Sequence, residues 1–183
     1  MKTYKITSQK DLEKFKDDYG YKIDGNAEFS YTAIFSGRLL VEGYLEIEAG
    51  GYIEAGDWIK AGDWIKAGSW IKAGSWIKAG SWIKADGSIK AGDWIKAGGS
   101  YGIQAGLNIT CKGTLSFGLK AFAGINTWRG ISEKEKTITC SKMIGGGVVE
   151  YGILNETGEP ELDDKTEEAM RVLKEAGYKI VRD

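Results

Sequence analysis

The residues of this chain that could do chemistry are aspartates, lysines and tryptophans that recur at intervals of six. The 183 residues include no histidine, so Ser-His-Asp and Cys-His nucleophiles cannot form, and histidine-dependent metal sites are excluded. Carboxylate chemistry stays formally open, because Asp57, Asp63 and Asp93 occupy the same position of a repeat. Near-identical repeats present like groups, whereas an active site needs unlike groups that converge on one point. We therefore expect these aspartates to form hydrogen bonds at corners, and we expect no catalytic residue, no metal, no cofactor and no enzymatic activity.

The strongest candidate for function is a binding surface made of the tryptophans and lysines of the repeat. Its members are Trp58, Trp64, Trp70, Trp76, Trp82, Trp94, Lys60, Lys66, Lys72, Lys78, Lys84 and Lys96. Outward tryptophans beside lysines could stack on bases or sugar rings while the lysines pair with phosphates. The alternative is structural, because tryptophans can pack on one another and on lysine stems without any ligand. If several tryptophans are exposed together, a protein interface becomes the leading interpretation.

A six-residue tandem repeat must position these side chains. From Ile53 the chain reads IEAGDW, IKAGDW, IKAGSW and close copies, and the phase slips by two residues at 98–102. The aliphatic or aromatic residue that begins each hexad recurs at Phe35, Val41, Ile47, Ile53, Ile59, Ile65, Ile71, Ile77, Ile83, Ile89, Ile95, Ile103, Ile109 and Leu115. The repeat therefore predicts a solenoid over residues 35–126.

A period of six fits short strands joined by corners, because a helix of 3.6 residues per turn would spread the isoleucines around its axis. Side chains alternate along a strand, so Ile59 and Ala61 point inward and Lys60 points outward. The triplet Gly-Asp-Trp or Gly-Ser-Trp then forms the corner, where glycine relieves the backbone. One hexad cannot bury its isoleucine alone. The hexads must therefore stack into an all-β, parallel β-solenoid.

Three hexads per coil give about 18 residues per turn and two give about 12, and we predict the larger coil. An 18-residue coil places tryptophans of successive turns about 4.8 Å apart. The two columns are then Trp58, Trp76 and Trp94, and Trp64 with Trp82. The expected charged neighbours are Glu42 with Lys60, Glu48 with Lys66, and Glu54 with Lys72. A 12-residue coil would instead align Trp58, Trp70, Trp82 and Trp94 along one edge.

The repeat resembles the hexapeptide-repeat left-handed parallel β-helix proteins, in which an aliphatic residue begins each hexad and a small residue follows four positions later. Ile71 with Ser75 and Ile77 with Ser81 fit that pattern. The resemblance implies a left-handed solenoid. Enzymes of that class depend on histidine, as a catalytic base in acyltransferases and as a zinc ligand in solenoidal carbonic anhydrases. Neither activity carries over to a chain without histidine, so the resemblance is to a non-enzymatic variant.

We expect caps at both ends of the solenoid, because open strand edges invite aggregation. Residues 1–34 form the predicted N-terminal cap, with a strand at 4–7 and a helix at 9–18 that Ser8 caps. Residues 127–183 form the predicted C-terminal cap. Its expected elements are a strand pair at 137–143 and 148–154 around the glycines 145–147, a linker at 157–164, a helix that extends to 176 and a strand at 178–182.

Composition and charge limit the partners, the cellular location and the cysteine chemistry that we expect. The middle of the chain is net basic and both ends are net acidic, which could attract polyanions or favour self-association. The first residues lack the apolar core of a signal peptide, and no stretch has the length of a membrane helix. Two cysteines, Cys111 and Cys140, are too few for a disulfide scaffold. We expect reduced thiols, with a disulfide between them as the alternative, a cytoplasmic location and no membrane partner.

Three functional hypotheses remain open. The first is a protein-binding solenoid that engages or inhibits a macromolecular partner, with protein favoured over nucleic acid. Small solenoids without catalytic groups loosely resemble the pentapeptide-repeat inhibitors of DNA-acting enzymes and phage-encoded anti-defence, anti-CRISPR-like proteins. The second is direct nucleic-acid binding by the basic Trp/Lys segment. The third is self-assembly into a homodimer or filament, as in the solenoidal bactofilins, although terminal caps oppose an open filament.

Overall fold

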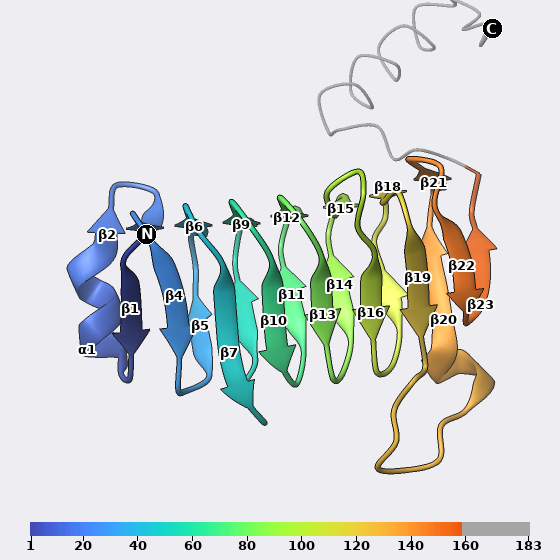
Figure 1. The fold of residues 1–183 in the computed structure, drawn as a ribbon, viewed down its shortest axis with the longest axis horizontal. Coiled ribbons are helices and arrows are strands. Elements are labelled where there is room, and N and C mark those ends of the chain that lie inside the picture. The colour runs from blue at the N-terminus through green and yellow to red at the C-terminus, as the bar shows by residue number, and fades with distance from the viewer. Residues whose placement is uncertain (159–183) are drawn as a thin grey trace, which may run out of the picture.

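The chain forms a parallel β-solenoid whose coils follow one another along a single long axis (Figure 1). The computed structural model describes residues 1–158. About eight coils have a mean spacing of about 19 residues. The coils contribute strands to three sheets, of eight, eight and seven strands, which enclose the interior from three sides. An all-β, parallel β-solenoid, as the repeat predicts, is therefore confirmed.

Each sheet is a ladder built from every third strand of the repeat. Sheet A contains β1 (Thr3–Ile6), β4 (Asn26–Phe29), β7 (Leu45–Ala49), β10 (Ile65–Gly68), β13 (Ile83–Ala85), β16 (Ile103–Ala105), β19 (Lys120–Ala123) and β22 (Val148–Tyr151). Sheet B contains β2 (Lys16–Asp17), β3 (Gly20–Ile23), β6 (Arg38–Val41), β9 (Ile59–Ala61), β12 (Ile77–Ala79), β15 (Ile95–Lys96), β18 (Thr114–Ser116) and β21 (Lys142–Ile144). Sheet C contains β5 (Ala33–Phe35), β8 (Ile53–Ala55), β11 (Ile71–Ala73), β14 (Ile89–Ala91), β17 (Ile109–Thr110), β20 (Thr137–Cys140) and β23 (Ile153–Glu156).

Strand register fixes the size of the coil. Ile71 pairs with Ile53 in sheet C, and Ile77 pairs with Ile59 in sheet B, both separated by 18 positions. The 12-residue alternative is therefore wrong for the regular hexads. Where two residues are inserted at 98–102 the offset grows to 20, so that Ile103 pairs with Ile83.

The predicted phase is wrong before residue 50. Leu45 pairs with Ile65, so Ile47 lies opposite Ala67 and not opposite an isoleucine. Val41 and Phe35 likewise lie opposite Ala61 and Ala55. The reason is a second two-residue insertion in the corner that contains Gly50 and Gly51. Because side chains alternate, an insertion of two residues leaves the inward side chains inward.

The insertion also changes the charged neighbours of two lysines. Lys60 lies beside Leu40 and not Glu42, and Lys66 lies beside Glu46 and not Glu48. Both of those predicted pairings are wrong for the same reason. Lys72 does lie beside Glu54, because the coil between them has the regular 18 residues.

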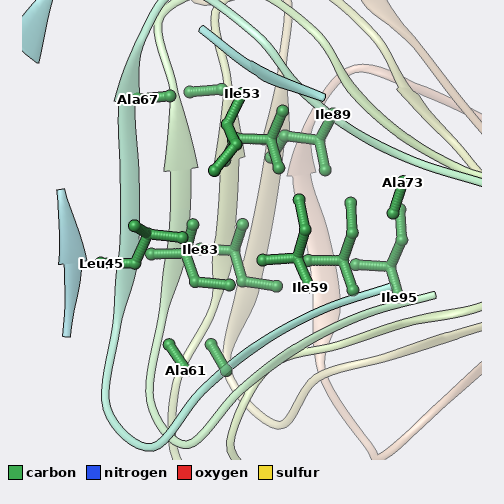
Figure 2. Close-up of a cluster of buried hydrophobic side chains, with 14 of the residues drawn as sticks. Leu45, Ile53, Ile59, Ala61, Ala67, Ala73, Ile83, Ile89 and Ile95 are labelled. Atoms are coloured by element: carbon green, nitrogen blue, oxygen red, sulfur yellow. The ribbon is translucent and has the colours of Figure 1, made fainter. Parts of the chain in front are cut away.

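The interior is a stack of isoleucines and alanines from the three sheets. In Figure 2, Ile83, Ile89 and Ile95 come from successive strands and point into the same interior. All three are 0% exposed, and the alanines of the hexads are nearly as buried. Fully burying an isoleucine is worth about 1.5–3 kcal/mol, so repetition of this one side chain supplies most of the driving force for coiling.

Both ends of the described chain differ from the repeat. The helix expected at 9–18 is shorter, with α1 (Gln9–Leu12) followed by a 3-10 turn η1 (Glu13–Phe15). It ends because β2 pairs antiparallel with β3 around Tyr19, whose backbone N–H bonds to Asp17. Strands β1–β5 and β20–β23 also join the three ladders, so these extend on both sides of residues 35–126.

The predicted strand pair around glycines 145–147 is wrong. Strands β20, β21 and β22 belong to three different sheets, and each pairs in parallel with the preceding coil. The glycines form a solenoid corner, in which Gly145 and Gly146 have positive φ angles of 98° and 80°. A long excursion with the 3-10 turn η2 (Glu133–Lys136) precedes β20. The helix expected to begin at Asp164 or Thr166 and to extend to 176, and the strand expected at 178–182, lie outside the described residues, as does the linker expected at 157–164 from residue 159 on.

Candidate functional site

The tryptophans of the repeat stand at the corners and stack on one another from coil to coil. Trp58, Trp76 and Trp94 form one column, with ring centroids 4.5 and 4.8 Å apart and ring planes within 8° of parallel. We call it the Trp58 column. At its base the guanidinium of Arg38 lies 5.2 Å from the centroid of the Trp58 ring. The predicted column is confirmed.

A second column joins Trp64 and Trp82, as predicted, with a centroid distance of 4.9 Å. Tyr44 extends it by one coil at 4.3 Å from Trp64. The third corner carries Trp70, which stacks on Tyr52 at 3.8 Å. Sequence reasoning missed both tyrosines. The insertion at Gly50–Gly51 moves Tyr44 out of the hexad phase, since Leu45 pairs with Ile65 at an offset of 20. Tyr52 is in phase, 18 positions before Trp70, and was missed because only tryptophans were followed through the repeat.

Stacking leaves the six repeat tryptophans half-buried. Each interior member of a column has both ring faces covered by its neighbours, so mainly its edge meets solvent. This arrangement supports the structural interpretation of the columns, since stacked aromatic pairs add about 0.5–1.5 kcal/mol beyond their buried area. The seventh tryptophan, Trp128, lies outside the repeat and is 66% exposed; no periodic signal points to it.

The candidate lysines are divided among three faces. Lys66 and Lys84 project from sheet A, Lys60, Lys78 and Lys96 from sheet B, and Lys72 from sheet C, where it lies beside Lys90, which is not among the candidates. The twelve candidate residues therefore do not form one surface. They form three parallel stripes, each with an aromatic column two residues before its lysines.

In two of the three lysine stripes, the lysine nearest the N-terminus forms an ion pair with a glutamate of the preceding coil. Lys66 contacts Glu46 at 2.7 Å, and Lys72 contacts Glu54 at 2.5 Å. The hydrogen bond to Glu46 raises the pKa of Lys66 above its ordinary value. On sheet B, in contrast, no ion pair joins Lys60, Lys78 or Lys96 to any of residues 1–158.

We call the outward side of sheet B at these coils the basic face. It consists of Lys60, Lys78 and Lys96 with the Trp58 column beside them. By strand register the lysines repeat at the ladder spacing of about 4.8 Å. Leu40 on the preceding coil pairs with Lys60, at the position that Glu46 occupies in sheet A and Glu54 in sheet C.

The aspartates of the repeat bond to serines of the next coil. The hydroxyl of Ser75 donates to Asp57 at 2.9 Å, and that of Ser81 donates to Asp63 at 2.7 Å. The expectation of corner hydrogen bonds is confirmed for these two residues. Within the described part of the chain, no three Cys, Asp or Glu side chains come together as a metal ion would require.

The two cysteines are free thiols on adjacent coils, buried in the interior. Burial raises the pKa of Cys111 to about 12 and that of Cys140 to about 11. The disulfide alternative is wrong for this structure. A thiol with so high a pKa is not a nucleophile at neutral pH.

Two grooves occur where an aromatic column stops. The larger, of about 500 Å³, lies against Trp82, Gly102 and Lys120 on sheet A. The smaller, of about 360 Å³, lies against Trp70 and Ser88 on sheet C.

Comparison of the chain with known protein families, with curated proteins and with solved structures found no match. The class of protein therefore rests on the fold alone, which is that of a parallel β-solenoid. No helix in residues 1–158 has the length and apolar character that spanning a bilayer requires.

Proposed function

We propose that the chain is a non-catalytic binding protein that engages an acidic macromolecular partner through the basic face. The observation that carries the proposal is the contrast between the three lysine stripes. Glu46 and Glu54 neutralise the first lysine on sheets A and C, whereas Leu40 stands at that place on sheet B. A row of like charges without local counter-charge gains most from an oppositely charged partner.

A protein partner is favoured over nucleic acid on this face. Non-specific nucleic-acid binding uses free ring faces on which bases can stack, but Trp76 is covered by Trp58 on one side and Trp94 on the other. The ring edges and lysine stems remain accessible. These suit carboxylates and apolar side chains of a protein surface, where tryptophan edges and salt links combine.

The finer proposal is a rigid cytoplasmic inhibitor of a DNA-acting enzyme, of the kind carried by phages against host defence. In architecture it would be a non-enzymatic, left-handed hexapeptide-repeat solenoid. Its support is the regular, straight ladder of the hexads, which loses little conformational entropy when it binds.

Charge reversal on the basic face tests the proposal. The variant Lys60→Glu/Lys78→Glu/Lys96→Glu removes the stripe, and Lys10→Glu/Lys134→Glu/Lys142→Glu changes the charge equally at exposed sites elsewhere. Cross-linked complexes from cells of the native host are identified by mass spectrometry, and the affinity for each captured partner is then measured with purified protein. A partner that the control retains and the basic-face variant binds at least about tenfold more weakly supports the proposal. Equal binding by both variants overturns it.

Direct nucleic-acid binding by the basic face is the second candidate, favoured by the same unpaired lysines. Its test is a salt titration of binding to short DNA, where three phosphate contacts predict a slope of about −2 to −3 in log affinity against log salt. Absence of binding, or binding that ignores salt, removes this candidate. Light scattering over a range of concentrations tests the third hypothesis, self-assembly into a homodimer or filament, and a constant monomer mass removes it.

A further inference from the structure

The aromatic column on sheet A is interrupted at Gly102. Register carries the column from Trp82 to Gly102 and then to Lys120, since Ile83 pairs with Ile103 and Ile103 with Ala121. A Cβ at position 102 would lie 2.2 Å from the backbone oxygen of Lys120. No side chain fits there, so one place in the column is obligatorily empty.

The empty place has the thickness of one aromatic ring. Trp64 covers one face of Trp82, and the other face borders the groove of about 500 Å³. Two ladder spacings, about 9–10 Å, separate the levels of Trp82 and Lys120. A planar ring at the intermediate level would stack on Trp82 and lie beneath the side chain of Lys120. We call this space the Trp82 notch.

Side chains of sheet A border the notch. Lys84, Gln104 and Phe122 project beside it at three successive levels, and the first two are polar. Lys120 is paired with Glu150 at 3.0 Å and Lys66 with Glu46 at 2.7 Å. No ion pair joins Lys84 to a described residue, so it supplies one uncompensated positive charge, and the amide of Gln104 can both donate and accept a hydrogen bond.

We propose that the Trp82 notch binds a nucleotide, with the base inserted between Trp82 and Lys120 and the phosphate on Lys84. Three features match this ligand class: an open indole face, an amide at the level of the inserted ring, and a cation beside it. An aromatic side chain of a protein would use the indole face but has little need of the amide. The proposal is independent of the basic face, which lies on another sheet.

The interruption on sheet C is an internal comparison. Trp70 stacks on Tyr52, and Ser88 follows in the column with Asn108 beyond it. This notch has lysines nearby, Lys72 and Lys90, but among residues 1–158 Asn108 and not a cationic residue follows the gap in the column. It should therefore bind a nucleotide more weakly than the Trp82 notch.

The test is an NMR titration of the whole chain with adenosine monophosphate, followed through the tryptophan indole N–H signals. The chain has seven tryptophans, and single substitutions of Trp82, Trp70, Trp58 and Trp76 by phenylalanine assign four of those signals. We expect the signal of Trp82 to shift at millimolar ligand, that of Trp70 to shift less, and those of Trp58 and Trp76 to stay unchanged. Adenosine should shift the Trp82 signal weakly, and ribose 5-phosphate should not.

Two substitutions separate the contributions of charge and amide. Lys84→Gln should weaken the monophosphate about fivefold and leave adenosine unchanged, whereas Lys90→Gln should change neither. Gln104→Met should weaken both ligands. If a single-stranded dinucleotide binds more tightly than the monophosphate, the ligand is a nucleic-acid strand. If it binds more weakly, the ligand is a free nucleotide. Both results support a notch that holds a base on Trp82 and a phosphate on Lys84.

The proposal is overturned if the monophosphate leaves the Trp82 signal in place, or shifts all tryptophan signals alike. It is also overturned if an acidic peptide that contains tryptophan shifts the Trp82 signal and the monophosphate does not. The basic-face variant should bind the monophosphate as the unaltered chain does. Failure of the protein-binding proposal therefore leaves this one standing, and the reverse also holds.

Discussion

The hydroxyl of Ser75 donates a hydrogen bond of 2.9 Å to the carboxylate of Asp57, one coil earlier in the solenoid. Ser81 and Asp63 repeat this contact at 2.7 Å. The relationship explains why serine follows aspartate one coil later at these two corners, as in Asp57 then Ser75 and Asp63 then Ser81. Two aspartates in direct register on adjacent coils would repel each other. A serine at the second position removes that repulsion, and its hydroxyl donates a hydrogen bond to the carboxylate.

Loss of the serine hydroxyl should destabilise the fold measurably. Ser81 is 5% exposed, so Ser81→Ala removes a nearly buried bond and should lower the free energy of unfolding by about 1 kcal/mol. The measurement is urea denaturation followed by circular dichroism. Ser69 makes no side-chain hydrogen bond to another described residue, and Ser69→Ala is the matched control. Equal effects of the two substitutions would contradict a role for the Ser81–Asp63 contact.

The aromatic columns should contribute stability in proportion to the stacks that each ring makes. Trp76 stacks on both Trp58 and Trp94, whereas Trp94 stacks only on Trp76 among the aromatic rings described. Trp76→Ala should cost about 3 kcal/mol and Trp94→Ala about half as much. Trp128→Ala should change stability by less than about 0.5 kcal/mol, because that ring is exposed. If Trp94→Ala costs as much as Trp76→Ala, stacking is not the source of the stability.

The regular hexads made the coil and its columns predictable, because identical units leave few ways to stack. The phase error before residue 50 has a particular cause. Ile47 and Ile53 are six apart in sequence, yet Ile47 faces Ala67 at the second inward position of its strand. The spacing is a coincidence produced by a strand and a corner that are longer than in the other hexads.

The last coil could not be predicted for a different reason. Its strands β20, β21 and β22 pair with residues 28 or 29 positions earlier, across the loop that holds η2, as in Thr114 with Lys142, whereas β23 pairs with β20 only 16 positions earlier. Nothing local in 137–156 encodes that distant parallel pairing. Three consecutive glycines then suggested a hairpin, although they form a corner. Of the candidate site, the columns were foreseen, but the Trp82 notch depends on Gly102, whose role only three-dimensional register reveals.

Glycine at the corners should be required wherever two coils approach through their backbones. A Cβ on Gly74 would lie 1.9 Å from the carbonyl oxygen of Gly56, whereas a Cβ on Gly99 would meet nothing within 4 Å. Gly74→Ala should therefore destabilise the fold by about 3 kcal/mol or more, and Gly99→Ala should lie within about 0.5 kcal/mol of the parent. Thermal or urea midpoints compare the two. A tolerated Gly74→Ala would show that the corners can separate, contrary to the close contact described.

The two thiols should react only when the solenoid opens. Burial raises the pKa of Cys111 to about 12 and that of Cys140 to about 11, so almost no thiolate exists at pH 7, where thiolate is the reactive form. Native protein should react with a disulfide reagent at least about a hundredfold more slowly than the same protein in denaturant. Cys111→Ser and Cys140→Ser identify the slower thiol. Fast labelling without denaturant would contradict the buried placement.

Low pH should destabilise the loop that precedes β20, because it protonates Glu135. Hydrogen bonds from Arg129 and from Ser132 lower the pKa of Glu135 from 4.5 to about 2. A carboxyl whose pKa is lower in the folded state contributes stability that is complete above about pH 4.5 and is lost as the pH falls through about 2. Titration of the Glu135 side-chain carbon by NMR should give the low pKa directly.

Glu135 should also contribute to the pH dependence of the free energy of unfolding. Glu135→Gln keeps the shape of the side chain but cannot titrate, so the stability of this variant should fall less steeply between pH 4.5 and 2 than that of the parent. It should not become flat, because Lys14 and the Thr7 and Ser8 hydroxyls also hold the pKa of Asp11 well below its ordinary value. Ser69→Ala, which alters no titratable group, is the control and should keep the parental slope. A parental slope in Glu135→Gln as well would mean that the Arg129–Glu135 contact does not persist in solution.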